Sequence, residues 1–171
     1  MNIIKIYIDE GPSSVPDNFP SIIVTHAMGE FIRDGNGEFG PKGKIYHFLE
    51  WLRILGYSAH GFIEPSGRII QAREWTQGAW HCSANHMNYI AIGIEWIVEG
   101  IHDITTLREA MKGNWVSDAQ LVAGAELYSM LMRDYNIKKL TQHRWEDPQG
   151  KEDPGEGFPQ QLLENLLSDK Q

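Results

Sequence analysis

At 171 residues, with 42% hydrophobic and 22% charged side chains, the chain has the composition of one globular domain that can bury its own core. Its formal net charge of −8 argues against a nucleic-acid partner and gives no attraction to an anionic membrane surface. Cys82 is the only cysteine, which excludes an intrachain disulfide and suits a reducing compartment.

The N-terminal segment 1–10 has no basic region followed by a long apolar stretch, so it predicts a β-strand and not a signal peptide. No run in the sequence approaches the roughly 18 apolar residues of a transmembrane helix. We therefore expect a monomer that is made in the cytoplasm and does not insert into a membrane.

Short apolar runs alternate with turn-rich segments near the start of the chain. Ile3–Ile8 is apolar and β-branched, which predicts a strand, and Ser21–His26 predicts a second, buried strand. The turn-rich segment Ser13–Pro20 separates the two. Asp34–Pro41 is rich in glycine and predicts a flexible loop.

The middle of the chain predicts one helix, one hairpin and one central strand. Apolar residues at helical spacing favour an amphipathic helix over Tyr46–Leu55. Gly56–Ile63 and Pro65–Gln71 predict a β-hairpin with its turn at Glu64–Gly67. Ile90–Val98 is the most apolar strand, which places it in the interior of the sheet.

The last third predicts two helices and a short strand. Ser117 is a good N-cap for a long helix through Tyr135, and Phe158–Leu167 predicts a terminal helix. Lys138–Thr141 predicts a strand. Because strands and helices interleave without repeats or linkers, we expect an α/β fold over residues 1–171, a single domain with a central mixed β-sheet flanked by helices.

One loop between residues 142 and 155 carries an imidazole, an ammonium and a carboxylate. Imidazole and carboxylate are good ligands for Zn²⁺, and a catalytic zinc needs about three protein ligands plus an open position. The proline and glycine residues of the loop can hold His143 and Asp153 on one ion although they are ten residues apart. His26 supplies a third candidate ligand at the end of an apolar run, and Asp147 is a rival within the loop. The sequence predicts a zinc hydrolase.

The polar residues of interest fall in four segments, most of them at strand ends or in adjoining loops, where α/β sheets build their sites. The segments are Ile23–His26, then Ser58–Ile63 with Gly67–Gln71, then Ala79–His81 with Asn88 and Ile92–Glu95, and finally His143 with Lys151–Gly155. Taken together and in this order, they resemble the zinc-dependent N-acetylmuramoyl-L-alanine amidases, the group that includes phage lysins and peptidoglycan recognition proteins. Each segment alone is weakly specific, whereas all four in order are highly specific.

The resemblance implies that His26, His143 and Asp153 are the zinc ligands, although some family members carry Cys at the third position. It also implies that Glu95 is the general base and that Lys151 stabilises the transition state. The bond cut in the family is the amide that joins N-acetylmuramic acid to L-alanine of the peptide stem.

Other positions of the family pattern point to substrate contacts and to one choice of base. Certain phage members place Tyr just before the hairpin His and lack the Glu; this chain has Ala59 there, so Glu95 should carry the proton transfer. The Trp-His segment of the family implies a substrate contact for His81, and Asn88 is a candidate for binding the glycopeptide. The chain departs from the pattern in the length of the Asp34–Gly43 loop.

General chemistry supports these roles independently. Amide hydrolysis at neutral pH needs a nucleophile stronger than water, and zinc lowers the pKa of a bound water to ~7. An ammonium such as Lys151 can stabilise the oxyanion, and a carboxylate that accepts the proton of the water can return it to the leaving amine. Glu95 lies in an otherwise apolar strand, so it should be paired or have a raised pKa.

Each position also has a structural alternative. His26 can cap a strand, Glu95 can be an ion-paired core residue, Lys151 a solvated loop residue, His81 part of the site wall and Asn88 a turn residue. We expect His60 to pack or to support the site and not to bind metal. Cys82 adjoins His81, but neighbouring residues of an extended segment point to opposite faces, so a small buried thiol is favoured over a Cys–His nucleophile pair.

We interpret the chain as a single-domain zinc amidase of peptidoglycan, a phage-type endolysin that reaches the bacterial cell wall through a separate pore. A cytosolic amidase that recycles soluble anhydromuropeptides uses the same His-His-Asp site and is the nearest alternative. A muropeptide-binding module that has lost catalysis is a third, against which the intact ligands and Glu95 count. Loss of turbidity of intact walls would indicate the endolysin, and cleavage of soluble muropeptides would indicate the recycling amidase. No release of stem peptide from either would indicate the binding module.

Overall fold

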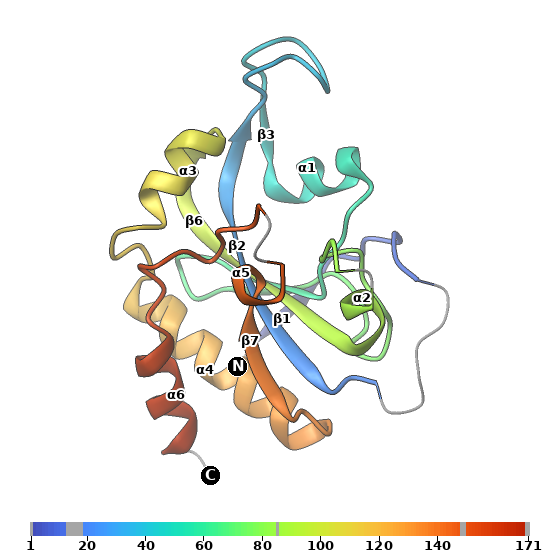
Figure 1. The fold of residues 1–171 in the computed structure, drawn as a ribbon, viewed down its shortest axis with the longest axis vertical. Helices are drawn as coiled ribbons and strands as arrows, with labels where there is room; N and C mark the ends of the chain where they lie inside the picture. The colour runs from blue at the N-terminus through green and yellow to red at the C-terminus, as the bar shows by residue number, and fades with distance from the viewer. Residues whose placement is uncertain (1, 13–18, 85, 148–149, 170–171) are drawn as a thin grey trace.

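The structure is a computed structural model that describes residues 2–12, 19–84, 86–147 and 150–169 (Figure 1). Its strands are β1 (Ile3–Lys5), β2 (Ile22–Arg33), β3 (Ile45–His47), β4 (Gly61–Ile63), β5 (Ile69–Gln71), β6 (Ala91–His102) and β7 (Lys139–Gln142). Within the described residues they form one seven-stranded sheet in the order β1-β5-β4-β6-β2-β3, with β7 also paired to β2. Parallel and antiparallel pairs both occur, which confirms the predicted α/β fold with a central mixed sheet.

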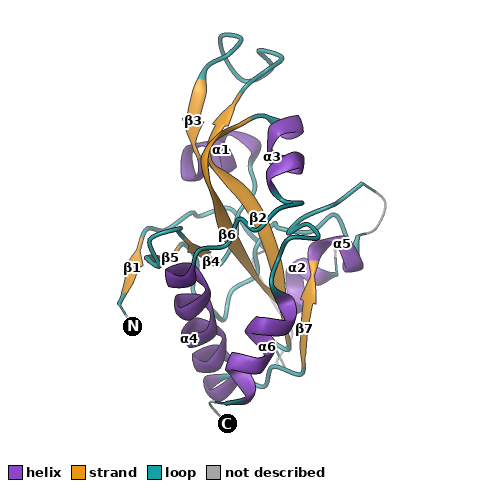
Figure 2. Cartoon of the chain, turned by 90° about the vertical axis from the view of Figure 1, so that its left-hand side faces the viewer, coloured by secondary structure: helices purple, strands orange, loops and turns teal. Residues whose placement is uncertain are grey.

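Helices cover both faces of this sheet. They are α1 (Phe48–Leu55), α2 (Met87–Ile90), α3 (Ile104–Ala110), α4 (Asp118–Asp134), α5 (His143–Glu146) and α6 (Gln160–Ser168). Figure 2 shows α4 and α6 lying together along the lower part of the sheet, where they share one hydrophobic cluster. Among the described residues, no helix combines the length and the apolar character that a membrane crossing requires.

The two long strands β2 and β6 organise the core. They pair in parallel along most of their length, side by side in Figure 1. In β6, Ile94 and Trp96 pack toward α4, whereas Ile97 packs with Phe48 of α1 on the other face. Because successive strand residues alternate between faces, Glu95 belongs to the α1 side, and the candidate site is built there.

Several predicted elements are confirmed. The hairpin forms, with Gly61 paired to Gln71 in antiparallel strands β4 and β5. β6 lies in the interior of the sheet between β4 and β2. The side chain of Ser117 accepts a hydrogen bond from Gln120 N at 3.0 Å and caps α4. Of the predicted turn Ser13–Pro20, residues 13–18 lie outside the described part of the chain.

Other boundaries differ from the prediction for identifiable reasons. The first strand, β1, ends at Lys5, and β2 continues past His26 to Arg33 because β6 and β3 pair with its second half. The helix predicted from Tyr46 begins at Phe48, since Tyr46 lies in β3 opposite Ile32. The short helices α2, α3 and α5 were not predicted.

The Asp34–Gly43 loop forms the tip of the β2–β3 hairpin, at the upper end of Figure 1. The carboxylate of Asp34 accepts backbone hydrogen bonds from Gly37 at 2.8 Å and Phe39 at 2.9 Å. These bonds lower the pKa of Asp34, the bond from Phe39 having the largest effect. The loop is therefore closed on its own first residue, away from the candidate site.

Candidate active site

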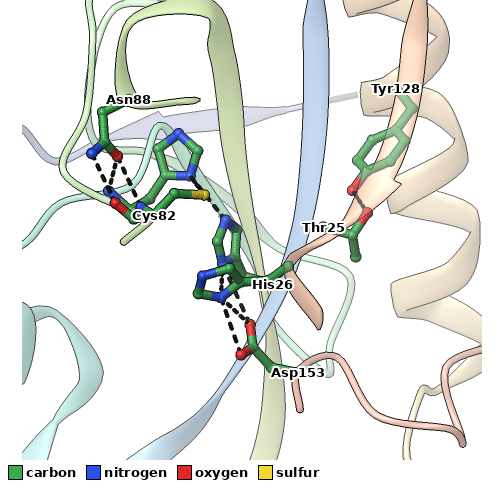
Figure 3. Close-up of polar contacts among 8 residues, drawn as sticks. Thr25, His26, Cys82, Asn88, Tyr128 and Asp153 are labelled. Carbon is green, nitrogen blue, oxygen red and sulfur yellow. Dashed lines mark hydrogen bonds and ion pairs between the residues drawn. The ribbon is translucent and has the colours of Figure 1, made fainter. Parts of the chain in front are cut away.

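Register between the two long strands creates the centre of the site. His26 of β2 pairs with Glu95 of β6, and paired residues of neighbouring strands point to the same face. Both side chains are buried, with 2% of His26 and 9% of Glu95 exposed. Figure 3 shows that His26 points away from the face of Thr25, whose hydroxyl lies 2.8 Å from Tyr128 Oη of α4.

Two further side chains reach this centre from the C-terminal third. β7 pairs with β2 as far as Thr25 and Gln142, so His143, the next residue, is placed beside His26 at the start of α5. Asp153 follows in the loop after α5, and the backbone N–H of Arg144 donates to its carbonyl at 3.0 Å. The loop is thus tied to the helix that carries the histidine.

The potential ligand atoms of these three residues converge on one point. Nδ1 of His26 lies 3.0 Å from Nδ1 of His143. Nδ1 of His143 lies 3.1 and 3.0 Å from the carboxylate oxygens of Asp153, and Nδ1 of His26 lies 3.4 Å from the nearer one. A tetrahedral zinc with bonds of about 2.0–2.1 Å would separate its ligand atoms by roughly 3.3 Å. The spacing therefore fits a zinc ion.

Charge and protonation also suit a metal. Burial lowers the pKa of His26 to about 4, so its imidazole is neutral at pH 7, the form that binds metal. Burial alone would raise the pKa of Asp153, but hydrogen bonds with His143 and His26 hold it below its ordinary value. Two imidazoles and one ionised carboxylate are the donors of known catalytic zinc sites.

A second group of donors shares His26 and has to be weighed against the first. Nε2 of His26 lies 2.9 Å from Nδ1 of His81, which lies 3.2 Å from Sγ of Cys82. Burial, followed by the carboxylates of Asp153 and Glu95, raises the pKa of the Cys82 thiol. The group with Asp153 has two imidazoles and one carboxylate, the donor set of known catalytic zinc sites, so we take it as the candidate metal site. Among the described residues, Asp147 belongs to neither group.

The surroundings of Glu95 favour the protonated form of its carboxyl group. Burial raises the pKa of its carboxyl group well above the ordinary value, as does the charge of Asp153, while Lys151 acts in the opposite direction. Within the described part of the chain, its Oε2 atom is buried without a hydrogen-bond partner. A buried carboxyl group with a raised pKa beside a candidate metal site is a candidate general base.

A groove of about 670 Å³ opens over these residues. All seven residues singled out from the sequence line it: His26, His81, Asn88, Glu95, His143, Lys151 and Asp153. Its walls also include Trp80 of the Trp-His segment and residues that the sequence did not suggest, namely Trp51 of α1, Tyr57, and Ile104, Leu107 and Arg108 of α3. Arg108 forms an ion pair with Glu152 at 3.3 Å at this edge of the groove.

The structure adds detail for residues whose roles were left open. The side chain of Asn88 forms hydrogen bonds with the backbone of the neighbouring segment. It accepts from the N–H groups of His81 and Cys82 at 2.9 and 2.8 Å and donates to Cys82 O at 2.8 Å. Its contact with substrate stays a prediction. His60 accepts from Gly93 N at 3.0 Å and donates to Gln77 O at 2.6 Å, which is a structural role.

Cys82 is buried, as predicted, but the geometric reason given for it was wrong. Sγ and the ring of His81 lie on the same side, because residues 81 and 82 belong to no strand and the backbone bends at residues 83 and 84. The raised pKa of the thiol, and not its direction, is what argues against a Cys–His nucleophile pair.

Comparisons with known proteins agree with this geometry. A family model described as N-acetylmuramoyl-L-alanine amidase matches residues 16–156. A 1,6-anhydro-N-acetylmuramyl-L-alanine amidase, AmpD of Haemophilus influenzae, is 29% identical over 131 residues, a match that covers 71% of this chain and 64% of that protein. The chain thus spans less than two thirds of the length of this relative.

Solved structures share the fold. The N-acetylmuramoyl-L-alanine amidase LysC from Clostridium intestinale superposes with a TM-score of 0.66 at 23% identity, over 98% of both chains. A selenomethionine derivative of AmpD superposes with a TM-score of 0.69 at 24% identity, over 96% of this chain and 94% of the other.

Proposed function

Because the chain belongs to the N-acetylmuramoyl-L-alanine amidase family, we propose that it hydrolyses the amide between N-acetylmuramic acid and L-alanine in peptidoglycan, with one zinc ion held by His26, His143 and Asp153. The observation that carries the proposal is the convergence of these three ligand atoms beside a buried Glu95 at the floor of the groove. Zinc, when bound, supplies a Lewis acid that polarises the carbonyl and lowers the pKa of water toward ~7.

Glu95 has the position and the protonation behaviour of the proton carrier. Its carboxylate accepts a proton from the attacking water, and the raised pKa allows it to hold that proton in the buried site. It then returns the proton to the nitrogen of the leaving L-alanine, so that no free amide anion has to form. Its Oε2 atom has no hydrogen-bond partner among the described residues, so one oxygen of the group is available for this exchange.

Lys151 supplies positive charge at the edge of the groove. It lies two residues before Asp153 in the same loop and lines the groove with it. An ammonium at this place stabilises the negative charge that develops on the carbonyl oxygen during attack. His81 and Asn88 line the same groove, and we propose that the bound glycopeptide passes over this wall.

The bond that is cut can be tested by mass spectrometry of digested peptidoglycan. Free stem peptides with an L-alanine amino terminus are expected, and the glycan strands should stay intact. The zinc content is measured on the same preparation, with His143→Ala as the variant that should lose the metal and the exposed His86→Ala as the matched control. New reducing sugar ends without stem peptides would contradict the amidase, and full zinc in His143→Ala would contradict the ligand set.

We propose an endolysin acting on the cell wall as the biological setting. The groove runs from α1 to α3 and adjoins a further pocket of about 480 Å³ that shares Arg108 and Lys151 with it, which gives room for a polymeric substrate. The alternative, recycling of soluble anhydromuropeptides, is favoured by the similarity to the Haemophilus protein. Rates on intact walls and on soluble anhydromuropeptides, measured with one preparation, separate the two. Binding of both without release of peptide would indicate a non-catalytic binding module.

A further inference from the structure

His81 contacts the candidate ligand His26 at the ring nitrogen opposite the candidate metal position. Its Nδ1 atom lies 2.9 Å from Nε2 of His26, the ring nitrogen that faces away from His143 and Asp153. The two rings meet edge to face, with centroids 5.0 Å apart. His143 differs, because its Nε2 atom has no hydrogen-bond partner among the described residues. Of the two histidine ligands, His26 is therefore the one whose ring is held by another side chain.

One arrangement of protons satisfies this contact. If Nδ1 of His26 binds metal, the proton of the neutral ring lies on Nε2 and is donated to Nδ1 of His81. The proton of His81 then lies on Nε2, which is 3.3 Å from the carbonyl oxygen of Ala91. The hydrogen bonds thus run from the metal ligand through His81 to the backbone at the start of β6.

The surrounding structure fixes His81 in this place. Asn88 accepts its backbone N–H at 2.9 Å. The ring lies against Gly93 of β6, where an added Cβ atom would come within 2.6 Å of the ring carbon Cγ. β6 therefore leaves room for this imidazole by having no side chain at residue 93.

We propose that His81 is a positioning residue that fixes the tautomer and ring orientation of His26, so that Nδ1 is presented to zinc. Partners that hold a histidine ligand in this way typically contribute about 10–100-fold in metal affinity. The inference rests on the proposed function for the identity of the metal and its ligands. It assigns to His81 a task that does not depend on contact with substrate.

The test uses zinc affinity, measured on the full chain by competition with a chelator and without an activity assay. His81→Leu removes the acceptor and should weaken zinc binding about 10–100-fold. His81→Asn has nearly the same size as Leu but keeps an acceptor oxygen near the place of Nδ1, and it should recover most of the affinity. Nitrogen-15 spectra of the zinc-loaded protein should place the proton of His26 on Nε2 in the wild type and in His81→Asn.

Gly93→Ala provides a route that removes no polar group from the chain. The new methyl group would displace the His81 ring, so zinc affinity should fall as it does in His81→Leu. Gly35→Ala is the control, because a Cβ atom there meets nothing within 4 Å in the described part of the chain. This pair keeps the proposal testable if His81→Leu does not fold.

Three outcomes would overturn the inference. Unchanged zinc affinity in His81→Leu and Gly93→Ala would show that His26 needs no support. Equal loss in His81→Asn and His81→Leu would show that the acceptor is not the cause. A loss in Cys82→Ser as large as that in His81→Leu would favour the donor group of His26, His81 and Cys82. If the wild type binds zinc and releases stem peptides normally, each outcome counts against the inference and leaves the proposed amidase intact.

Discussion

At the scale of single residues, Glu95 and His60 show how burial acts on two ionisable groups of the same molecule. Both are buried, but His60 has hydrogen-bond partners for both ring nitrogens, whereas Oε2 of Glu95 has none among the described residues. A buried polar atom without a partner usually has a functional reason, since its desolvation is not offset. Glu95 lines the groove, so we propose that the desolvation of its Oε2 atom is retained for a catalytic role.

Glu95→Gln should keep the fold and the zinc but lose most activity. The substitution keeps the size of the side chain and removes the ionisable group, so a fall in kcat of about 10²–10⁴-fold is expected. Metal content, melting temperature and kcat are measured on one preparation. Glu99→Gln is the control, because Glu99 lies on the same strand and is exposed. Near wild-type kcat with bound zinc in Glu95→Gln would remove this residue from the mechanism.

Sequence alone was informative for the site residues but not for their mutual contacts. His26 could be proposed because it ends an apolar run, Glu95 because it is ionisable within an otherwise apolar strand, and His143 because it shares a Pro/Gly-rich loop with Asp153. The contact between His26 and His81 could not, because it joins residues 55 positions apart and depends on the placement of the His81 ring against Gly93.

At the scale of elements, His60 links the β4–β5 hairpin to β6. Its ring nitrogen Nδ1 accepts a hydrogen bond from the backbone N–H of Gly93. The backbone N–H of His60 donates to Gly93 O at 2.9 Å, and the backbone carbonyl of His60 accepts from Ala72 N at 2.8 Å. Burial lowers the pKa of His60 to about 4, so protonation would break the contact with Gly93. The junction of hairpin and central strand is thus sensitive to acid.

This junction predicts a loss of stability in acid for the metal-free protein. The folded pKa of His60 is about 4 and therefore lies below the unfolded value, so its contribution is present above about pH 6.5 and is lost as the pH falls toward 4. One proton taken up only by the unfolded chain gives a slope of about 1.4 kcal/mol per pH unit. Denaturant unfolding of the wild type and His60→Asn between these pH values measures the contribution of His60 to the pH dependence of the unfolding free energy. Parallel curves for the two proteins would contradict the assignment.

The helix α3 supports the loop that carries Asp153. Gly155 has a φ of +83°, and a Cβ atom there would come within 2.5 Å of Met111, which follows α3. The backbone N–H of Gly157 donates to Met111 O at 2.9 Å. The glycine allows the loop to lie close against the end of the helix, and this contact fixes the approach of Asp153 to the two histidines.

Gly155→Ala should therefore weaken zinc binding, although Gly155 is not one of the proposed ligands. Gly150→Ala is a matched control, because Gly150 also has a positive φ, +114°, but a Cβ atom there meets no described atom within 4 Å. Both variants should cost about 1–2 kcal/mol of stability from backbone strain. Only Gly155→Ala adds the clash with Met111, so only it should raise the Kd for zinc. Equal Kd values in the two variants would show that α3 does not position the loop.

The elements that the sequence missed are those held by tertiary contacts. α3 has only seven residues and α5 only four, too short for helical periodicity to identify. The second half of β2 contains Gly29 and Glu30 and is stabilised by pairing with β6 and β3. The long helix α4 and the apolar strand β6 were predictable because each carries its own pattern over many residues.

At the scale of the whole molecule, the proposed zinc site connects segments that are far apart in the chain. His26 lies in β2, near the start of the chain, while His143 and Asp153 lie in the last third of the sequence. β7 places His143 through only a few paired residues, and the Asp153 loop is held by α3 and α5. A bound metal would join these parts, and the unfolded chain would not present the same ligands together.

Zinc should therefore stabilise the whole fold by mass action. A ligand at about 100 times its Kd adds roughly 2.7 kcal/mol, and for a chain of about 150–250 residues each kcal/mol moves the Tm by about 2–4 °C. Removal of zinc by a chelator should then lower the Tm by roughly 5–11 °C, and added zinc should restore it. His143→Ala should melt near the metal-free wild type and respond to neither treatment, because one ligand is missing. A wild-type Tm that does not change with chelator, in a protein shown to contain zinc, would mean that the metal is bound elsewhere than across these three segments.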